Sequence, residues 1–448
     1  MPQTCSGAAV PGCLRRPGRW RVALLVGLAV GVGVSLRAQA ATTWTVCASG
    51  CDYSRIKAAI AASTTLDGDT LAIAAGTYTE AGITVDKSLT LQGERAATTI
   101  VQAAASRSEA TARVFTITRG VTVILRALTI QHGNTVGEGG GIHNSGKLTL
   151  NRSTVRDNTA DSAGGIYNSG RLILIASTVR GNAARSHGGL FNNRGTLTLT
   201  GSTVSGNRAR VNRAGGLYNL AGQLTLTDST VSGNRARYSG GGLYNEQGTL
   251  TLTHSTVSGN RVDSGSGGGL WNQGTLTLTH STVSGNTASG LGGGLYNTNY
   301  QLSNYQVTLT LTHSTVSGNA AGKGGGLYND MGRLTLTNSL IANQPNGGDC
   351  VPVWSITSMG YNLDSDSSCQ LTAATDRPGV DPLLGPLQDN GGPTLTHALL
   401  PGSPAIDAIP WGTNGCGTTY TDDQRGQARP QPAGGACDSG AYEVGVDG

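Results

Sequence analysis

The sequence predicts an all-β protein whose central part is a parallel β-helix, a solenoid in which one chain winds into stacked coils. One phrase recurs eight times, most cleanly from Leu250 to Thr275, with openings that follow one another mostly at 24 to 27 residues. The opening Leu250-Thr251-Leu252-Thr253 alternates apolar and polar residues, the pattern of a strand with one buried face. A repeat this short cannot enclose a core alone and has to stack on its neighbours. The 69 glycines and the threonine-rich strands argue against helical repeats. The openings begin at Leu148, Leu172, Leu197, Leu224, Leu250, Leu276, Leu309 and Leu334.

Residues 1–40 have the pattern of a secretory signal. The apolar run from Val22 to Leu36 is 15 residues long, follows a basic segment and precedes Ala38-Gln39-Ala40. A membrane-spanning helix needs about 20 apolar residues, so we predict a cleaved signal that ends at Ala40. No other run is long enough to span a membrane. We therefore expect a secreted or cell-surface protein.

The charge of the chain changes when the signal is removed. The formal net charge is +5, from 31 basic and 26 acidic residues, and the signal holds five basic residues and no acid. The remaining 26 basic and 26 acidic residues are unevenly placed: 15 against 7 in residues 131–343, and 3 against 12 in residues 344–448. Nucleic acid is a poor candidate partner for an exported chain with equal numbers of basic and acidic residues.

The six cysteines outside the signal predict disulfides, because an even number in an exported chain is typical of them. We expect sequence neighbours to pair, although six cysteines allow 15 pairings. A zinc site of cysteines is disfavoured, since no Cys-x-x-Cys pair occurs. The neighbours are Cys47 and Cys51, Cys350 and Cys369, and Cys416 and Cys437.

Residues 41–130 are predicted to form an N-terminal cap and the first coils. The exposed end of a solenoid is an open sheet edge that needs a cap. The segment from Ser54 to Ala62 places Ile56, Ala59 and Ile60 on one helical face, with Ser54 as the expected N-cap.

Within residues 131–343, one repeat supplies three predicted strands. They are Leu250 to Thr253, Ser255 to Asn260 around Val257, and Leu270 to Asn272, with glycines 267–269 at a tight bend. Equivalent residues of successive coils then lie about 4.8 Å apart. Leucines and valines stack inside, and asparagines form two columns that we interpret as structural ladders. The columns are Asn158, Asn182, Asn207, Asn234, Asn260, Asn286 and Asn319, and Asn144, Asn168, Asn192, Asn219, Asn245, Asn272, Asn297 and Asn329.

Residues 344–448 change abruptly to a composition rich in Gly, Pro and Asp, which predicts a separate, loop-rich C-terminal cap. Four stretches of the chain resemble three known families. Tyr53 to Gly93 resembles the entry of pectin-lyase-like right-handed β-helix proteins, and Gly285 to Asn297 is similar to repeats of chlamydial-type polymorphic outer-membrane adhesins. In the tail, Asp389 to Ala408 and Cys437 to Val444 resemble the choice-of-anchor C-terminal region of bacterial β-helix surface proteins. The resemblance implies a right-handed coil and surface display, with plain secretion as the alternative.

An aromatic column is the first candidate ligand site. Each ring follows a residue expected to point into the core, as Trp271 follows Leu270, so we expect the rings to point outward, where they could stack on sugars. The alternative is a self-packing ladder that stabilises the coil. The ligand candidates are Tyr218, Tyr244, Trp271 and Tyr296, within a column that also holds His143, Tyr167, Phe191 and Tyr328.

A second candidate site is basic. Arginines recur one and three positions after the asparagine of the corner, so adjacent coils present guanidinium groups side by side. Such a surface suits carboxylated or sulfated glycans, teichoic acid or phosphate. The alternative is a solvated turn that discourages lateral aggregation. The arginines are Arg208, Arg235 and Arg261 in one column, and Arg185, Arg210 and Arg237 in the other.

A third column holds His254, His280 and His313, and imidazoles at coil spacing could bind a transition metal. No carboxylate accompanies them regularly in the repeats, so we predict no metal site and no cofactor. Catalysis is also disfavoured, because hydrolysis needs paired carboxylates and the acids of the repeats are isolated.

The sequence thus predicts a secreted or surface β-helix that binds glycans or other surfaces without chemistry, and no catalytic residue. A polysaccharide lyase or glycoside hydrolase is the first alternative, and a structural spacer or coat component is the second. The ligand, the mode of attachment and the oligomeric state stay open at this stage.

Overall fold

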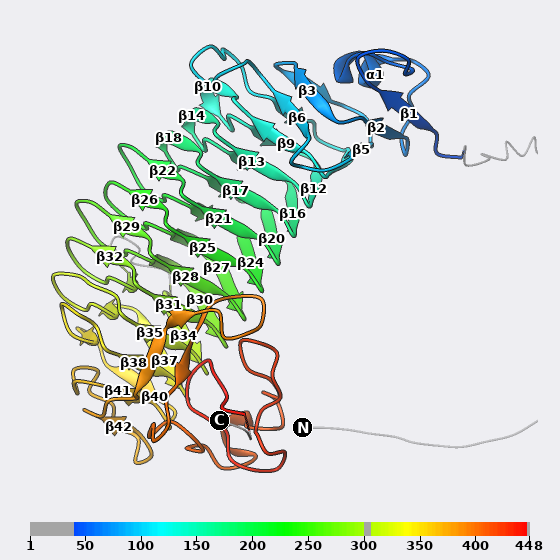
Figure 1. The fold of residues 1–448 in the computed structure, drawn as a ribbon. Helices are drawn as coiled ribbons and strands as arrows, with labels where there is room; N and C mark the ends of the chain where they lie inside the picture. The colour runs from blue at the N-terminus through cyan, green and yellow to red at the C-terminus, as the bar shows by residue number, and fades with distance from the viewer. Residues whose placement is uncertain (1–39, 300–305, 446–448) are drawn as a thin grey trace, which may run out of the picture. The chain divides into compact units, whose positions relative to one another are not determined.

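The computed structural model describes residues 40–299 and 306–445. The predicted signal at 1–39 lies outside the described residues. From Ala41 onward the chain forms one compact unit. In the described part, sheets of 22, 13 and 7 strands run along a solenoid, and all their pairings are parallel (Figure 1). The predicted all-β parallel β-helix is confirmed.

We name the three parallel sheets by number. Sheet 1 holds β1 (Thr43–Val46), β2 (Thr70–Ile73), β4 (Ile83–Val85), β5 (Thr90–Gly93), β7 (Phe115–Ile117), β8 (Thr122–Arg126), β11 (Ile142–Asn144), β12 (Lys147–Asn151), β15 (Ile166–Asn168), β16 (Arg171–Ile175), β19 (Leu190–Asn193), β20 (Thr196–Thr200), β23 (Leu217–Leu220), β24 (Gln223–Thr227), β27 (Leu243–Thr253), β30 (Leu270–Thr279), β33 (Leu295–Thr298), β34 (Thr308–Thr312), β36 (Leu327–Asp330), β37 (Arg333–Thr337), β39 (Cys350–Pro352) and β40 (Ile356–Ser358). Sheet 2 holds β3 (Gly76–Thr79), β6 (Thr99–Gln102), β9 (Thr129–Gln131), β13 (Thr154–Arg156), β17 (Thr178–Arg180), β21 (Thr203–Ser205), β25 (Thr230–Ser232), β28 (Thr256–Ser258), β31 (Thr282–Ser284), β35 (Thr315–Ser317), β38 (Leu340–Ala342), β41 (Leu363–Asp364) and β42 (Arg377–Pro378). Sheet 3 holds β10 (Asn134–Glu138), β14 (Thr159–Ser162), β18 (Ala183–Ser186), β22 (Arg208–Ala209), β26 (Arg235–Ala236), β29 (Arg261–Val262) and β32 (Thr287–Ala288).

The strands of a coil are divided differently from the predicted arrangement, as β27 and β30 show. The segment Leu270–Asn272, expected as a separate strand, runs into the next Leu-Thr-Leu-Thr opening and forms the single strand β30. The additional short strand is β29, directly after the corner at Asn260. Two residues are too few to show an alternating pattern, which is why the sequence did not reveal this strand.

The core consists of the apolar residues that alternate along sheets 1 and 2. Leu250, Leu252 and Val257 expose 1% or less of their surface. Leu250 pairs in register with Leu276, and Val257 with Val283, so each column repeats itself from coil to coil. Burial of one such side chain contributes about 1.5–3 kcal/mol.

The asparagine columns form hydrogen-bonded ladders inside the corners, as predicted. Asn260 Nδ2 donates to Asn286 Oδ1 at 2.9 Å, and Asn245 Nδ2 donates to Asn272 Oδ1 at 2.9 Å. The paired glycines of each repeat leave room for the first ladder: a Cβ on Gly242 would lie 2.9 Å from the side chain of Asn260. The same chemistry explains why glycine and asparagine recur together in the sequence.

The N-terminal end is capped by the helix α1 (Ile56–Ala61), whose Ile56, Ala59 and Ile60 are buried. The predicted helix and its buried face are confirmed, but Ser54 is not the N-cap. The N-cap position is Arg55, and its side chain makes no capping hydrogen bond. Instead, the carboxylate of Glu80 accepts hydrogen bonds from the backbone N–H of Ile56 and Lys57 at 2.8 and 3.0 Å. Because the capping carboxylate comes from a later coil, the residues next to the helix give no indication of it.

The C-terminal region first continues the solenoid and then folds back onto its flank. Strands β39 to β42 extend sheets 1 and 2 beyond residue 343. The remaining residues, which we call the flap (residues 379–448, described to residue 445), contain the antiparallel pair β43 (Leu384–Gln388) and β44 (Thr396–Leu399) and the 3-10 helix Thr413–Gly415. Figure 1 shows the flap, in orange and red, against the later coils. The expected separate cap is therefore integrated with the solenoid.

The flap covers the outer face of sheet 2 in the later coils, where it bonds to Thr256, Thr282 and Ser284. The threonine that opens a repeat's sheet-2 strand is half-buried in the earlier coils, at Thr203 and Thr230, and buried at Thr256, Thr282 and Thr315. All three predicted disulfides form, and they join sequence neighbours. They are Cys47–Cys51, Cys350–Cys369 and Cys416–Cys437.

Candidate functional site

The aromatic column forms a ladder outside the main core. Tyr244 stacks on Trp271 with ring centroids 5.5 Å apart, and Trp271 contacts Tyr296 at 4.3 Å. Tyr218, Tyr244 and Tyr296 are only 7%, 2% and 7% exposed, while Trp271 is half-buried. The rings lie outside the main core, as expected, but the three tyrosines are buried against their neighbours in the column, so these rings are not open to a ligand.

The hydroxyl groups of this ladder are also occupied. Tyr218 donates to Glu246 at 2.6 Å, and Tyr244 donates to Gln273 at 2.6 Å. Burial raises the pKa of both phenols. His187 stacks on Tyr218 at 4.3 Å, and burial, followed by the charge of Arg213, lowers its pKa to about 4. The arrangement is the self-packing ladder that the sequence left as the alternative.

The arginine columns lie on the outer face of sheet 3, in the register predicted. Arg208 pairs with Arg235, and Arg235 with Arg261, in neighbouring parallel strands. All six predicted side chains are exposed, whereas the residues between them, such as Ala209 and Ala236, are buried. The six are Arg185, Arg208, Arg210, Arg235, Arg237 and Arg261.

Asp263 neutralises part of this surface. Arg235 Nε donates to both of its carboxylate oxygens at 2.8 Å, and Arg261 Nε donates at 3.2 Å. Burial works to raise the pKa of Asp263, but the hydrogen bonds from the two arginines lower it overall. Among the described residues, the other four arginines of the two columns have no ion pair within 4.0 Å. Arg185 and Arg210 also line an open hollow of about 290 Å³, with Val136 and Val211 at its wall.

The histidine column lies at a corner where the backbone is left-handed and where the flap docks. His254, His280 and His313 have φ values of 50°, 44° and 43°. Asp228 and Asn338 occupy the same position in neighbouring coils with φ of 51° and 52°. Histidine, asparagine and aspartate tolerate this conformation better than branched residues do, which accounts for the residue types in the column.

Side chains of the flap contact this column. The ring of Tyr420 packs edge-on against His280 and His313 at 5.4 and 5.1 Å, and the guanidinium of Arg429 reaches His313 Nδ1. Asp422 Oδ1 lies 3.5 Å from His254 Nε2. Burial, followed by the charges of Arg429 and His254, lowers the pKa of His280 to about 2, so this imidazole is neutral.

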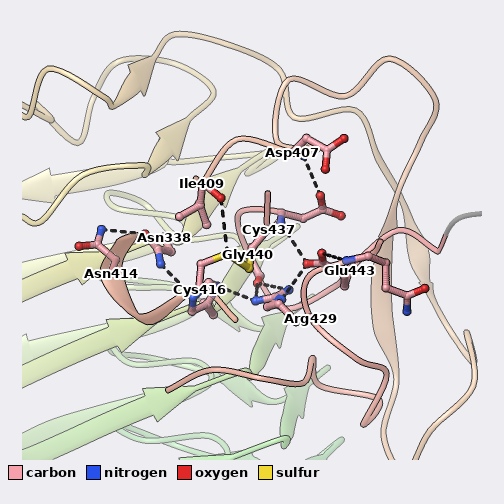
Figure 2. The surroundings of a disulfide bond; sticks show 12 residues. Asn338, Asp407, Ile409, Asn414, Cys416, Arg429, Cys437, Gly440 and Glu443 are labelled. Carbon is pink, nitrogen blue, oxygen red and sulfur yellow. Dashed lines mark hydrogen bonds and ion pairs between the residues drawn. A yellow bond between two sulfur atoms is a disulfide. The ribbon is translucent and has the colours of Figure 1, made fainter. Parts of the chain in front are cut away.

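The interior of the flap is organised around the Cys416–Cys437 disulfide (Figure 2). Arg429 donates to the carbonyl of Gly440 at 3.1 Å and forms a buried ion pair with Glu443 at 2.8 Å. Asn414 Nδ2 donates to Asn338 Oδ1 at 3.0 Å, which joins the flap to the corner column. These contacts hold the chain that presents Tyr420 and Asp422.

Three acids converge near the Cys350–Cys369 disulfide, in the C-terminal region and outside the repeats whose acids were expected to be isolated. Oxygen atoms of Asp349, Asp364 and Asp366 lie within 4.8 Å of one another. Asp349 Oδ2 accepts from the N–H of Ser365 at 2.6 Å, and Asp366 Oδ2 accepts from the N–H of Asp349 at 3.0 Å. Burial raises the pKa of Asp349 to about 6. These hydrogen bonds tie the turns at the end of the solenoid together.

One repeat family and several solved structures are similar to parts or most of this chain. The Chlamydia polymorphic membrane protein repeat matches residues 280–298. No curated protein matches the chain. Among solved structures, the chain is similar to pectate lyase Pel9A, at 13% identity over 90% of this chain and 96% of that one, with a TM-score of 0.44. It is also similar to pectin methylesterase PemA from Erwinia chrysanthemi (14%, 53% and 88%, TM-score 0.38) and to the PL6 family alginate lyase AlyGC (14%, 85% and 56%, TM-score 0.45).

In the described part of the chain, no helix is long and apolar enough to cross a membrane.

Proposed function

We propose that this chain is an exported β-helix protein that binds an anionic polymer, such as a polyuronate, along the outer face of sheet 3 without acting on it chemically. The observation that carries the proposal is the alignment of six exposed arginines in two columns of that sheet. Four of them have no carboxylate partner within ion-pair distance among the described residues.

The geometry of sheet 3 suits a repeating ligand. Side chains of one column are separated by the strand spacing of about 4.8 Å. Four of the arginines project from strands of sheet 3, and Arg210 and Arg237 directly follow the ends of β22 and β26. A guanidinium group binds a carboxylate through two parallel hydrogen bonds. A polymer with one carboxylate on each sugar can therefore meet several arginines in succession along the solenoid axis.

Most of the aromatic column is no longer a candidate binding surface, although the sequence suggested that it was. Because Tyr218, Tyr244 and Tyr296 are buried, we retain only the half-buried Trp271 as a candidate contact with a ligand. The signal at 1–40 and the choice-of-anchor character of residues 344–448 remain proposals. N-terminal sequencing of the exported protein, with Ala41 as the expected first residue, tests the signal.

Binding to polygalacturonate and alginate, with dextran as a neutral polymer, tests the function. We expect binding to the two polyuronates that weakens as salt is added. Substitution of Arg208, Arg210 and Arg237 by glutamine should reduce affinity at least about tenfold, which corresponds to about 1.4 kcal/mol. A matched control replaces Arg126, Arg171 and Arg333, which are equally exposed but lie in sheet 1.

Equal losses in the two triple variants would contradict a site on sheet 3. Release of unsaturated or reducing ends from either polymer would favour the lyase or hydrolase alternative instead. Lateral assembly of the protein without polymer binding would favour a structural spacer.

A further inference from the structure

The corner column and the flap bring three potential metal ligands to one point, although they are far apart in the sequence. His254 and His280 occupy equivalent positions in successive coils, and their rings lie nearly parallel with centroids 5.3 Å apart. Asp422 approaches both from the flap. The juxtaposition depends on the docking of the flap, so the repeats alone do not provide it.

The distances between the three ligand atoms are those of a tetrahedral site. His254 Nε2 lies 3.2 Å from His280 Nδ1, and Asp422 Oδ1 lies 3.5 Å from the first nitrogen and 3.6 Å from the second. Zinc bound to nitrogen and oxygen at about 2.0–2.2 Å holds neighbouring ligand atoms roughly 3.3–3.6 Å apart. We propose that His254 Nε2, His280 Nδ1 and Asp422 Oδ1 bind a divalent transition-metal ion, with Zn²⁺ as the expected metal.

A metal ion accounts for these approaches better than hydrogen bonding does. One proton shared between the imidazoles satisfies the 3.2 Å contact, but it leaves the carboxylate oxygen beyond good hydrogen-bond distance from both nitrogens. An ion at the centre of the triangle serves all three lone pairs. The set of two imidazoles and one carboxylate suits zinc.

The surroundings support ligation at these particular atoms. Asp228 Oδ1 lies 3.7 Å from His254 Nδ1, where a carboxylate favours a proton on Nδ1 and leaves Nε2 free to bind. The side chains of His254, His280 and Asp422 are 18%, 3% and 45% exposed. Solvent therefore reaches the site from the side of Asp422, where a water can complete the tetrahedron.

The third histidine of the column is excluded from the site by its own partners. His313 Nδ1 contacts the guanidinium of Arg429, and its Nε2 lies 2.9 Å from Asn338 Nδ2. Both ring nitrogens of His313 therefore already have partners, the guanidinium of Arg429 and the amide of Asn338, and are not free to bind the ion. The ion would thus link the coils of His254 and His280 to the flap, and its removal would loosen the flap.

Titration of the untagged full chain, exported and stripped with a chelator, with Zn²⁺ alone tests the site. We expect one ion per chain, and visible absorption bands of tetrahedral Co²⁺ when cobalt replaces zinc. His254→Asn and Asp422→Asn should each weaken Zn²⁺ binding by about 10–100-fold. Asparagine suits the left-handed backbone at residue 254 and preserves the shape of Asp422, so both variants should fold.

His187→Asn is the matched control, because His187 also has a positive φ, of 55°, and belongs to the aromatic ladder instead. It should bind Zn²⁺ as the parent protein does. Zn²⁺ should also raise the melting temperature of the parent and the control but not that of the two site variants. Absence of stoichiometric binding, or equal binding by all variants, would overturn the proposal.

Discussion

Replacement of Asn260 by alanine should destabilise the solenoid far more than its single lost side chain suggests. Asn260 is fully buried in the corner ladder. Its Oδ1 accepts from the backbone N–H and from the side-chain amide of Asn234, both at 2.9 Å. Its Nδ2 donates to the carbonyl of Val231 and to Oδ1 of Asn286, also at 2.9 Å. Alanine at this position therefore removes four hydrogen bonds.

The cost of this change differs among the four bonds. The amide of Asn234 still donates to Val204, and Asn286 Oδ1 still accepts from the backbone of residue 260. The backbone N–H of Asn234 keeps no such second bond and is left buried. An unsatisfied buried group costs about 1–3 kcal/mol, and each ordinary hydrogen bond contributes about 1 kcal/mol. We therefore expect a loss of roughly 3–5 kcal/mol in the free energy of unfolding.

Urea unfolding followed by circular dichroism measures this loss. Because solenoids can unfold region by region, hydrogen exchange at the amides of Asn234 and Asn260 should be recorded as well. Asn212→Ala is the control, since Asn212 is exposed and its side chain makes one hydrogen bond, to Ser186 at 3.3 Å. The control should change stability by less than about 0.5 kcal/mol. A similar small change in Asn260→Ala would refute the ladder argument.

Three further predictions concern other parts of the molecule. The pKa of His187 is lowered to about 4 from an ordinary 6.5, so the unfolded state binds the proton more tightly, and this residue should cost at most about 3 kcal/mol of stability as pH drops from 6.5 towards 4. Urea midpoints at pH 7 and pH 5 should show a larger loss in the parent than in His187→Asn, because His280, whose pKa is also lowered, contributes the same pH dependence to both proteins. Gly242→Ala should cost about 1–3 kcal/mol, because its Cβ would lie 2.7 Å from the carbonyl of Gly269, whereas Gly137→Ala, with a nearest contact of 3.5 Å, should be tolerated when both are compared by thermal unfolding. Gln424→Ala should speed hydrogen exchange in the flap but not in sheet 3, because Gln424 bonds to hydroxyl groups of the coils at 2.6 and 2.9 Å; equal exchange in both regions would contradict its docking role.

The sequence predicts the solenoid well because the coil is a local, repeating pattern. Alternation in Leu250–Thr253, the asparagine columns and the register of Arg208, Arg235 and Arg261 all follow from the period of the repeat. Parallel stacking places equivalent residues in contact, so a one-dimensional repeat determines which side chains meet. The helix Ile56–Ala61 could be predicted in the same way, because its apolar residues recur on one helical face.

The exposure of the candidate site residues depended on what covers them. The alternation at Leu270 and Trp271 correctly separates core from exterior, but it does not show that the rings of Tyr218 and Tyr244 lie under their neighbours. The same pattern left Arg208 exposed, because sheet 3 carries no further layer. Period alone therefore cannot separate a ligand-binding column from a structural one.

By itself, then, the sequence determined the coil, its ladders, its basic face and the pairing expected of neighbouring cysteines. Tertiary structure alone decided where residues 379–445 lie. It also decided the capping of the helix at Ile56, because the capping carboxylate of Glu80 comes from a later part of the chain. Gln424 meets Thr256 and Asp422 meets His254 across more than 160 residues. Such contacts arise where a segment without repeats packs on the repeating surface of the solenoid. Neither the period of the repeat nor local propensity predicts them.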